Sequence, residues 1–147
     1  MNDAREAVTA VLDAYKAAVH DKDVAAFAAL YDDEVRVFDM WGAWSFDGIE
    51  SLRAVATGWF GSLGTERVIV QADNIQGYAT GDLAAGHAFL TFAAVTSEGV
   101  ALRSMNNRIS LVLKRSGPSW KIVHQHTSAP ADFSTMKVTL RREQDAA

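Results

Sequence analysis

The sequence predicts an α+β domain in which three N-terminal helices pack on one face of an antiparallel sheet. Apolar residues recur at helical spacing in the first part of the chain, and from Glu66 onward β-rich segments alternate with short turns. Helices that precede a run of strands usually gather on one sheet face. At 147 residues, 49% of them hydrophobic, the chain can bury a core. We expect a single domain over residues 1–147.

The helices are predicted from apolar spacing and from capping residues. The first apolar stripe consists of Val8, Val11, Leu12, Tyr15, Ala18 and Val19. Asp23 is placed to cap a second, shorter helix. The segment Asp47-Gly48-Ile49-Glu50 is typical of a capping box and predicts a third helix.

The strands are predicted from residue type and from turn residues between them. A short strand over 35–39 precedes four longer ones over 67–77, 83–95, 101–113 and 120–127. Turns around Gly81, Gly99 and Gly117 predict antiparallel hairpins. We expect the core to span about residues 4–130. The extension 131–147 either adds an edge strand or crosses to a partner, and residues 141–147 are expected to fray.

Several strands are apolar on both faces, because Val112 alternates with Leu111 and Leu113. One face must meet the helices, and a large exposed apolar patch is unusual in a monomer. The pattern therefore predicts a homodimer that pairs through the outer sheet face, to which we assign Leu111.

Composition excludes several classes of partner. The formal net charge is −4, and no run of Lys and Arg exceeds two residues, which argues against nucleic-acid binding. No apolar run approaches the roughly 20 residues that span a bilayer, and the charged N-terminus is unlike a signal peptide. The chain has no cysteine, which suits a reducing compartment. We expect a cytoplasmic protein with no cofactor and with neither a nucleic acid nor a membrane as partner.

The pattern Trp120-x-x-Val123-His124-x-His126-x-Ser128-x-Pro130 resembles the ending of SnoaL-like proteins and of the calcium/calmodulin-dependent kinase II association domain. Both belong to the nuclear transport factor 2-like superfamily, and the resemblance covers Ala4 to Pro130. It implies a cone-shaped curved sheet whose concave face carries the helices, with a ligand-sized cavity and commonly a homodimer. The superfamily contains isomerases, cyclases, transport factors and scaffolding hubs, so the fold does not select a function.

Two residues match catalytic positions of ketosteroid isomerase within that superfamily. The segment Val37-Phe38-Asp39-Met40-Trp41-Gly42 resembles the stretch carrying its general base, at Asp39, and Tyr15 matches its oxyanion-binding tyrosine. A carboxylate that takes a proton beside a carbonyl, while a phenol stabilises the enolate oxygen, is sound chemistry. The isomerase also uses a second acid, where this chain has Met105-Asn106-Asn107-Arg108. The alternative is that Tyr15 is a core residue and Asp39 caps a turn.

The direction of the last strand leaves two alternatives. Strict alternation from Trp120 and Ile122 turns His124 and His126 toward the core. The resemblance instead implies that Val123, Gln125 and Thr127 face inward and that both histidines face a partner. Two histidines lack the third ligand of a metal site, and we expect no metal.

Aromatic side chains and scattered polar groups predict an apolar ligand pocket. Trp41 and Trp44 flank a Gly-Ala turn and are expected at its rim. The predicted ligand contacts are Trp41, Trp44, Trp59, His87, Phe89, Asn106, Arg108 and Gln125. The favoured function is binding of a small apolar molecule. The alternatives are an isomerase- or cyclase-type enzyme that abstracts a proton with Asp39, and an oligomerisation module.

Overall fold

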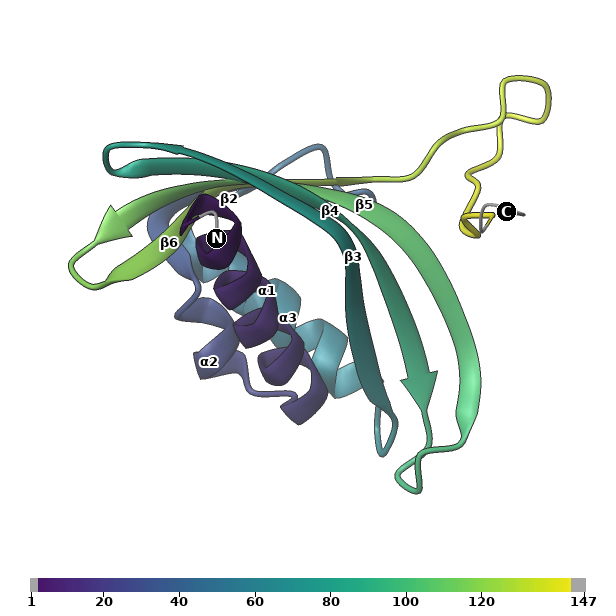
Figure 1. Ribbon diagram of the computed structural model, residues 1–147. Coiled ribbons are helices and arrows are strands. Elements are labelled where there is room, and N and C mark those ends of the chain that lie inside the picture. The colour runs from purple at the N-terminus through teal and green to yellow at the C-terminus, as the bar shows by residue number, and fades with distance from the viewer. Residues whose placement is uncertain (1–2, 144–147) are drawn as a thin grey trace.

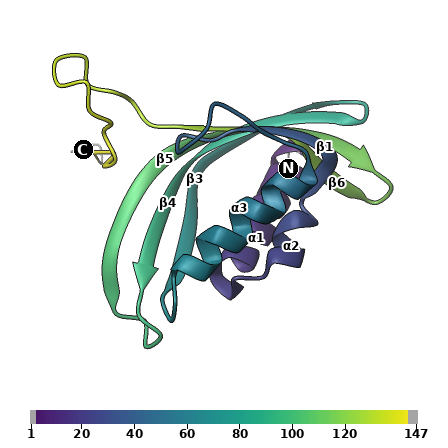
Figure 2. The same ribbon diagram turned by 180° about the vertical axis from the view of Figure 1, so that it is seen from behind.

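A computed structural model describes residues 3–143 and confirms the α+β fold class. One curved, six-stranded sheet arches over three helices, which lie on its concave side (Figure 1). The same layering is seen from behind in Figure 2. The elements, in chain order, are α1 (Asp3–Asp21), α2 (Val24–Ala28), β1 (Tyr31–Phe38), β2 (Phe46–Asp47), α3 (Ile49–Ser62), β3 (Arg67–Thr80), β4 (Leu83–Val95), β5 (Ala101–Ser116) and β6 (Ser119–Ser128).

The sheet order is β2-β1-β6-β5-β4-β3, and one strand pair departs from the expected antiparallel pattern. Strands β3 to β6 form the predicted meander of antiparallel hairpins. Strand β1 runs parallel to β6, so the sheet is mixed. The reason is the path of the chain, since α3 carries it from the β2 edge to the opposite edge and the meander then returns to β1.

The two predicted helix caps have different outcomes. Asp23 caps α2 as predicted, because its carboxylate accepts a hydrogen bond from the backbone N–H of Ala26 at 3.0 Å. The predicted cap by Asp47 is wrong. Gly48 precedes α3 with no side-chain cap, and Asp47 lies in β2, where its carboxylate accepts a hydrogen bond from Arg36 Nε at 2.7 Å. Asp47 does not cap α3 because its side chain pairs with Arg36 on the neighbouring strand.

The core lies between the three helices and the concave face of the sheet, and α1 packs on β3 and β4. Gly86 permits this close approach, because a Cβ atom there would lie 2.3 Å from Val8 Cγ2 and 2.8 Å from the Gln76 carbonyl oxygen. Real Cβ contacts are not that short, so a side chain at position 86 would push α1 off the sheet. The glycine therefore sets the distance between the helix layer and the sheet.

A β-bulge at Val123 decides which way the last strand faces. Ile122 pairs with Leu113, but His124 pairs with Val112, so Val123 is an extra residue in β6. Ile122, Gln125 and Thr127 are consequently all buried. Strict alternation correctly turned Ile122, before the bulge, toward the core. The resemblance correctly turned Gln125 and Thr127, after the bulge, toward the core.

Both histidines face the outer side of the sheet, where Phe38 packs edge-on against them at ring-centroid distances of 4.9 and 5.7 Å. Val112 lies on that side as well, opposite His124. The assignment of Leu111 to the outer face is wrong, because Leu111 is only 2% exposed in the core. A one-residue shift along a strand reverses the face.

After β6 the chain forms a tail that leaves the body of the molecule (Figure 1, yellow). A bridge between Ala131 and Val138 closes a small hairpin. The tail then returns to β5, where the Leu140 carbonyl accepts a hydrogen bond from the Asn106 N–H at 2.7 Å. Residues 144–147 of the expected fraying end lie outside the described residues. Over residues 3–143, none of the helices has the length and apolar character needed to cross a membrane.

Candidate functional site

A cavity of about 620 Å³ lies between the concave face of the sheet and the helices, and we call it the inner cavity. Aromatic and aliphatic side chains form most of its wall, among them Phe27, Leu52, Trp59 and Phe92. A mostly apolar hollow with a few polar groups is the usual form of a small-molecule site. Its polar groups come from α1, β5, β6 and the segment after β1.

Asp39 follows β1 and is held in the cavity wall by two hydrogen bonds. The Thr127 hydroxyl donates to Asp39 Oδ1 at 3.0 Å, and the Trp41 N–H donates to Asp39 Oδ2 at 3.1 Å. The Thr127 oxygen in turn accepts from the Met40 N–H at 3.0 Å. Both carboxylate oxygens are therefore oriented, without a cation within ion-pair distance among the described residues.

Tyr15 brings a phenol from α1 into the same cavity. Its ring is buried against Phe27 and Phe92. Burial raises the pKa of Tyr15 well above its usual value, and the nearby Asp39 charge raises it further. The phenol is thus neutral, and its hydroxyl makes no hydrogen bond to any of residues 3–143, which leaves it free to bind a ligand.

Gln125 points inward from β6 and is fixed by a second tyrosine. The Tyr31 hydroxyl donates to Gln125 Oε1 at 2.8 Å. Burial also raises the pKa of Tyr31 well above its usual value, so this donor stays protonated. With its oxygen engaged, the Gln125 amide offers its N–H groups to the cavity.

Asn107 is a polar residue of the cavity that we did not predict. It is 7% exposed, and its Nδ2 donates a weak hydrogen bond to Met40 Sδ at 3.4 Å. Its Oδ1 is buried and has no hydrogen-bond partner among the described residues. An unsatisfied buried oxygen costs about 1–3 kcal/mol. The signal was available, since Asn107 shares the inward series of β5 with Ile109 and Leu111.

The structure brings five of the predicted site residues together in the inner cavity. They are Tyr15, Asp39, Trp41, Trp59 and Gln125. Hydrogen bonds also connect Asp39 to Asn107, because Thr127 bonds both Asp39 and the Met40 N–H, and Met40 Sδ accepts from Asn107.

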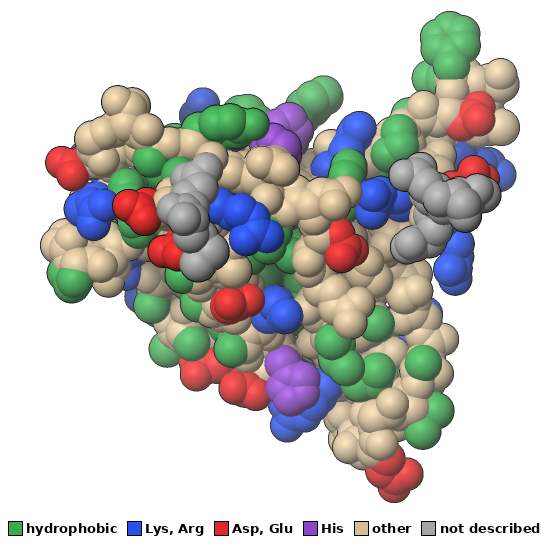
Figure 3. Space-filling model, in the orientation of Figure 1, with side chains coloured by type: hydrophobic (Ala, Val, Ile, Leu, Met, Phe, Trp, Pro, Cys, Tyr) green, Lys and Arg blue, Asp and Glu red, His purple; other side chains and the backbone are tan. Residues whose placement is uncertain are grey.

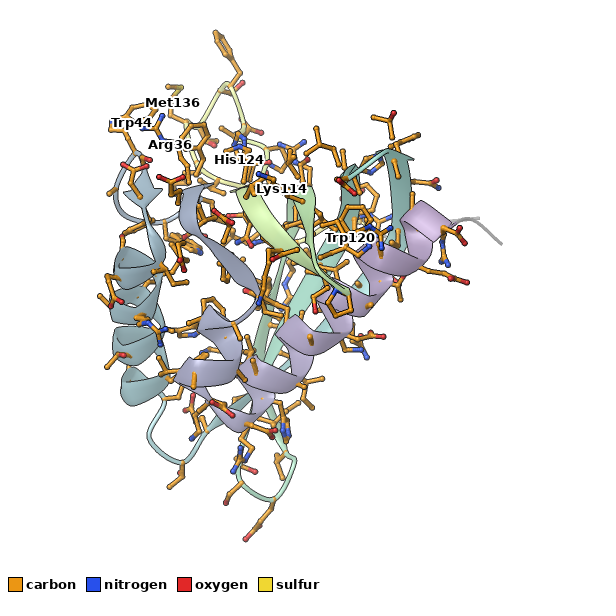
Figure 4. The ribbon with its side chains drawn as sticks, turned by 90° about the vertical axis from the view of Figure 1, so that its left-hand side faces the viewer. Arg36, Trp44, Lys114, Trp120, His124 and Met136 are labelled. Carbon is orange, nitrogen blue, oxygen red and sulfur yellow. The ribbon has the colours of Figure 1, made fainter. Side chains whose placement is uncertain are left out.

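The other five predicted site residues lie outside the inner cavity. Trp44 is 97% exposed on the loop before β2, and Figure 4 shows its ring at the outer edge of the molecule. Strand alternation places the remaining four on the outer face of β4 and β5, opposite the helices. They are His87, Phe89, Asn106 and Arg108.

Arg103 is a further cavity residue that sequence reasoning missed. Its guanidinium pairs with Glu66 at 2.6 Å, and this hydrogen bond lowers the pKa of Glu66. The Glu66 carboxylate offsets the charge of the Arg103 guanidinium, so Arg103 is not an unpaired cation for a ligand. Among the described residues, no three His, Asp or Glu side chains gather as a metal site would require.

The fold is shared with several solved structures. A nuclear transport factor 2-like protein of unknown function from Pseudomonas putida KT2440 matches with a TM-score of 0.80 and 24% identity over 93% of this chain and 94% of that one. A protein of the same superfamily from Salmonella enterica serovar Typhimurium matches with a TM-score of 0.67 and 20% identity, over 88% and 92% of the two chains. A Xanthomonas campestris protein named as a calcium/calmodulin-dependent protein kinase II association domain matches with a TM-score of 0.70 and 18% identity, over 84% and 85%.

No curated protein matches the sequence. The family model of the SnoaL-like domain matches residues 8–132, which include every strand of the sheet, α2, α3 and α1 from Val8 onward. This chain therefore belongs to the SnoaL-like domain family, and it shares its fold with nuclear transport factor 2-like proteins.

Proposed function

We propose that the inner cavity binds a small, neutral and largely apolar molecule that carries one hydrogen-bonding group. The observation that supports this most strongly is the joining of an apolar wall to a compact polar region. That region holds the Asp39 carboxylate, the Gln125 amide and the Tyr15 hydroxyl, and the Tyr15 hydroxyl has no hydrogen-bond partner among residues 3–143. Apolar area supplies the binding free energy, and a few placed polar groups supply orientation.

The ligand is proposed to be neutral because the free charge in the cavity is negative. Asp39 has no ion-pair partner among residues 3–143, and Arg103 is already paired with Glu66. A carboxylate ligand would have to approach Asp39 without a cation to offset the repulsion. A hydroxyl or carbonyl compound can instead hydrogen-bond to Asp39, Tyr15 or the Gln125 amide.

The test uses two probes with the same ring system and different polar groups, 2-naphthol and 2-naphthoate, in isothermal titration calorimetry. We expect 2-naphthol to bind at least about tenfold more tightly. Trp59→Ala removes cavity wall and should weaken 2-naphthol binding about tenfold or more. Trp44→Ala removes an exposed ring of the same kind and is the matched control. Equal binding of both probes would contradict the proposed polarity, and equal effects of the two substitutions would contradict the proposed location.

Native mass spectrometry of freshly purified protein complements this titration. Added non-covalent mass that Trp59→Ala abolishes and Trp44→Ala retains would give the formula of a natural ligand. Retention of that mass by both variants would place the ligand elsewhere on the molecule.

A second candidate function is supported by Asp39 and Tyr15 sharing the cavity. In this reaction Asp39 takes a proton from the α-carbon of a β,γ-unsaturated ketone, and the electron pair moves onto the carbonyl oxygen to give a dienolate. Tyr15 donates a hydrogen bond to that oxygen, and Asp39 returns the proton to the γ-carbon as the double bond moves into conjugation with the carbonyl. Asn107 lies in the segment that corresponds to the second acid of ketosteroid isomerase, and its neutral amide N–H group can serve as a further donor.

The enzyme reading is tested with 3-cyclohexen-1-one, whose conversion to the conjugated enone is followed by ultraviolet absorbance. Asp39→Asn should abolish turnover while 2-naphthol still binds, and Tyr15→Phe should lower kcat about 100-fold or more. Thr91→Val changes a hydroxyl on the outer face and serves as the control. If wild-type turnover is no faster than that of Asp39→Asn, Asp39 is not a general base for this reaction and the enzyme proposal is contradicted.

The assembly proposed for this domain is a homodimer that pairs through the outer sheet face. Exposed or half-exposed apolar and aromatic side chains occupy this face, and a second copy would cover them. They include Phe38, Ile69, Tyr78, Val112 and the two histidines of β6.

A further inference from the structure

A second hollow, of about 390 Å³, lies between the tail and the outer face of the sheet. We call it the tail cleft. Phe89, Asn106 and Arg108 line it from the sheet, and Thr139, Arg141 and Arg142 line it from the tail. It adjoins the inner cavity, since Asn107 lines both, but the other residues that line the two hollows differ. Leu140 faces the inner cavity, whereas its neighbours Thr139 and Arg141 line the tail cleft.

Positive charge is concentrated at the tail cleft. Three guanidinium groups, on Arg108, Arg141 and Arg142, meet one carboxylate, on Glu143. None of the three arginines forms an ion pair with a carboxylate of residues 3–143. Figure 3 shows Lys and Arg side chains gathered where the tail lies beside the sheet. In a chain with a formal charge of −4, this is a local excess of positive charge.

Two of these guanidinium groups are held in place before any ligand arrives. Arg108 Nε donates to Ser128 Oγ at 3.0 Å, and the two terminal nitrogens of that group make no hydrogen bond to residues 3–143. The Arg142 guanidinium lies over the Phe89 ring, with its central carbon 3.9 Å from the ring centroid. The Arg142 backbone N–H also donates to Asn106 Oδ1 at 2.8 Å and fixes the tail.

We propose that the tail cleft is a second binding site, for the oxyanion group of a small molecule, either a phosphate or a carboxylate. Guanidinium groups present paired N–H donors that match the oxygen spacing of both groups. The preset positions of Arg108 and Arg142 reduce the side-chain entropy lost on binding. Arg141 approaches from the tail and completes a set of three donors around one anion.

The experiment is isothermal titration calorimetry of the full chain with pyrophosphate and, separately, with citrate. Ionic strength is held constant with sodium chloride, so that simple screening does not change during the titration. Arg141→Gln is the informative substitution, because the Arg141 side chain makes no hydrogen bond or ion pair within residues 3–143 and its loss should not disturb the fold. Lys114→Gln removes an equal charge from an exposed position on β5 and is the matched control.

We expect saturable binding of at least one probe, with an affinity about tenfold lower in Arg141→Gln and unchanged in Lys114→Gln. Arg141→Lys should recover only part of the affinity, because a point charge lacks the paired donors. Preference for pyrophosphate assigns a phosphate ligand, and preference for citrate assigns a carboxylate. Equal losses in Arg141→Gln and Lys114→Gln, or the absence of saturable binding, would overturn the proposal. Trp59→Ala should leave this binding unchanged, so the tail cleft is tested independently of the inner cavity.

Discussion

The Thr127 hydroxyl joins the Asp39 carboxylate to the Met40 backbone, donating to Asp39 Oδ1 and accepting from the Met40 N–H, each at 3.0 Å. One side chain on β6 thereby fixes the segment that follows β1. Because β1 and β6 are parallel neighbours, this bond places the carboxylate at a set position in the cavity wall.

Thr127→Val should therefore destabilise the protein and misplace Asp39. Valine keeps the shape of threonine but leaves the Met40 N–H and one carboxylate oxygen without their partner. We expect the free energy of unfolding to fall by about 1–3 kcal/mol, measured by urea denaturation. Thr127→Ser keeps the hydroxyl and should recover most of that stability. If Thr127→Val and Thr127→Ser lose the same free energy of unfolding, the hydrogen bonds of the Thr127 hydroxyl do not contribute to stability.

Gly86→Ala should weaken the packing of α1 on the sheet. The added Cβ would meet both Val8 and a backbone oxygen, so the helix would have to shift. We expect a loss of about 1–3 kcal/mol in thermal or urea unfolding, or more if the helix cannot move. Gly58→Ala is the matched control, because its Cβ meets no atom within 4 Å on the exposed side of α3. That change should stabilise the protein by about 0.5–1 kcal/mol.

Val112→Glu should separate the proposed homodimer without unfolding the chain. Val112 lies on the outer sheet face, so a second copy would have to bury the new charge. The mass is measured by size-exclusion chromatography with light scattering, and the fold by circular dichroism. Leu111→Glu, one residue away, should instead unfold the protein, because Leu111 is in the core. A Val112→Glu protein that is still dimeric would place the interface on another surface.

Alkaline pH should destabilise the fold through two buried tyrosines. The folded-state pKa of both Tyr15 and Tyr31 is raised above the ordinary value of 10.0. Below that pH both phenols are protonated whether the chain is folded or not. Above it the unfolded chain releases protons that the folded chain retains, so the free energy of unfolding decreases as pH rises.

Urea midpoints between about pH 9 and about pH 11 measure this effect. Tyr15→Phe should give a shallower decline than wild type, because it removes one of the two linked protons. Tyr78→Phe removes a phenol from a ring that is 61% exposed and serves as the control. A decline of the same slope in Tyr15→Phe and wild type would show that Tyr15 ionises equally in both states.

The sequence predicted which helix residues face the inner cavity, but it did not predict which face of β4 and β5 lies inside. Tyr15 lies on a helical apolar stripe and Trp59 on an amphipathic helix, and such periodic patterns report burial directly. For β4 and β5 the pattern is apolar on both faces, so alternation identifies two sets without saying which is inside. His87, Phe89, Asn106 and Arg108 were therefore assigned to the cavity, whereas the structure places them outside it.

The sequence by itself determined the α+β class and the order of the three helices and the long strands, because periodicity and turn glycines are local signals. The curved sheet was expected from the resemblance to SnoaL-like proteins, and a shared site for Asp39 and Tyr15 was expected from the resemblance to ketosteroid isomerase. The short strand β2 was not predicted. Tertiary structure alone decided the parallel β1–β6 pair, the bulge at Val123 and the contact of the tail with β5. Each depends on which distant segments meet, and a single extra residue in a strand reverses every side chain beyond it.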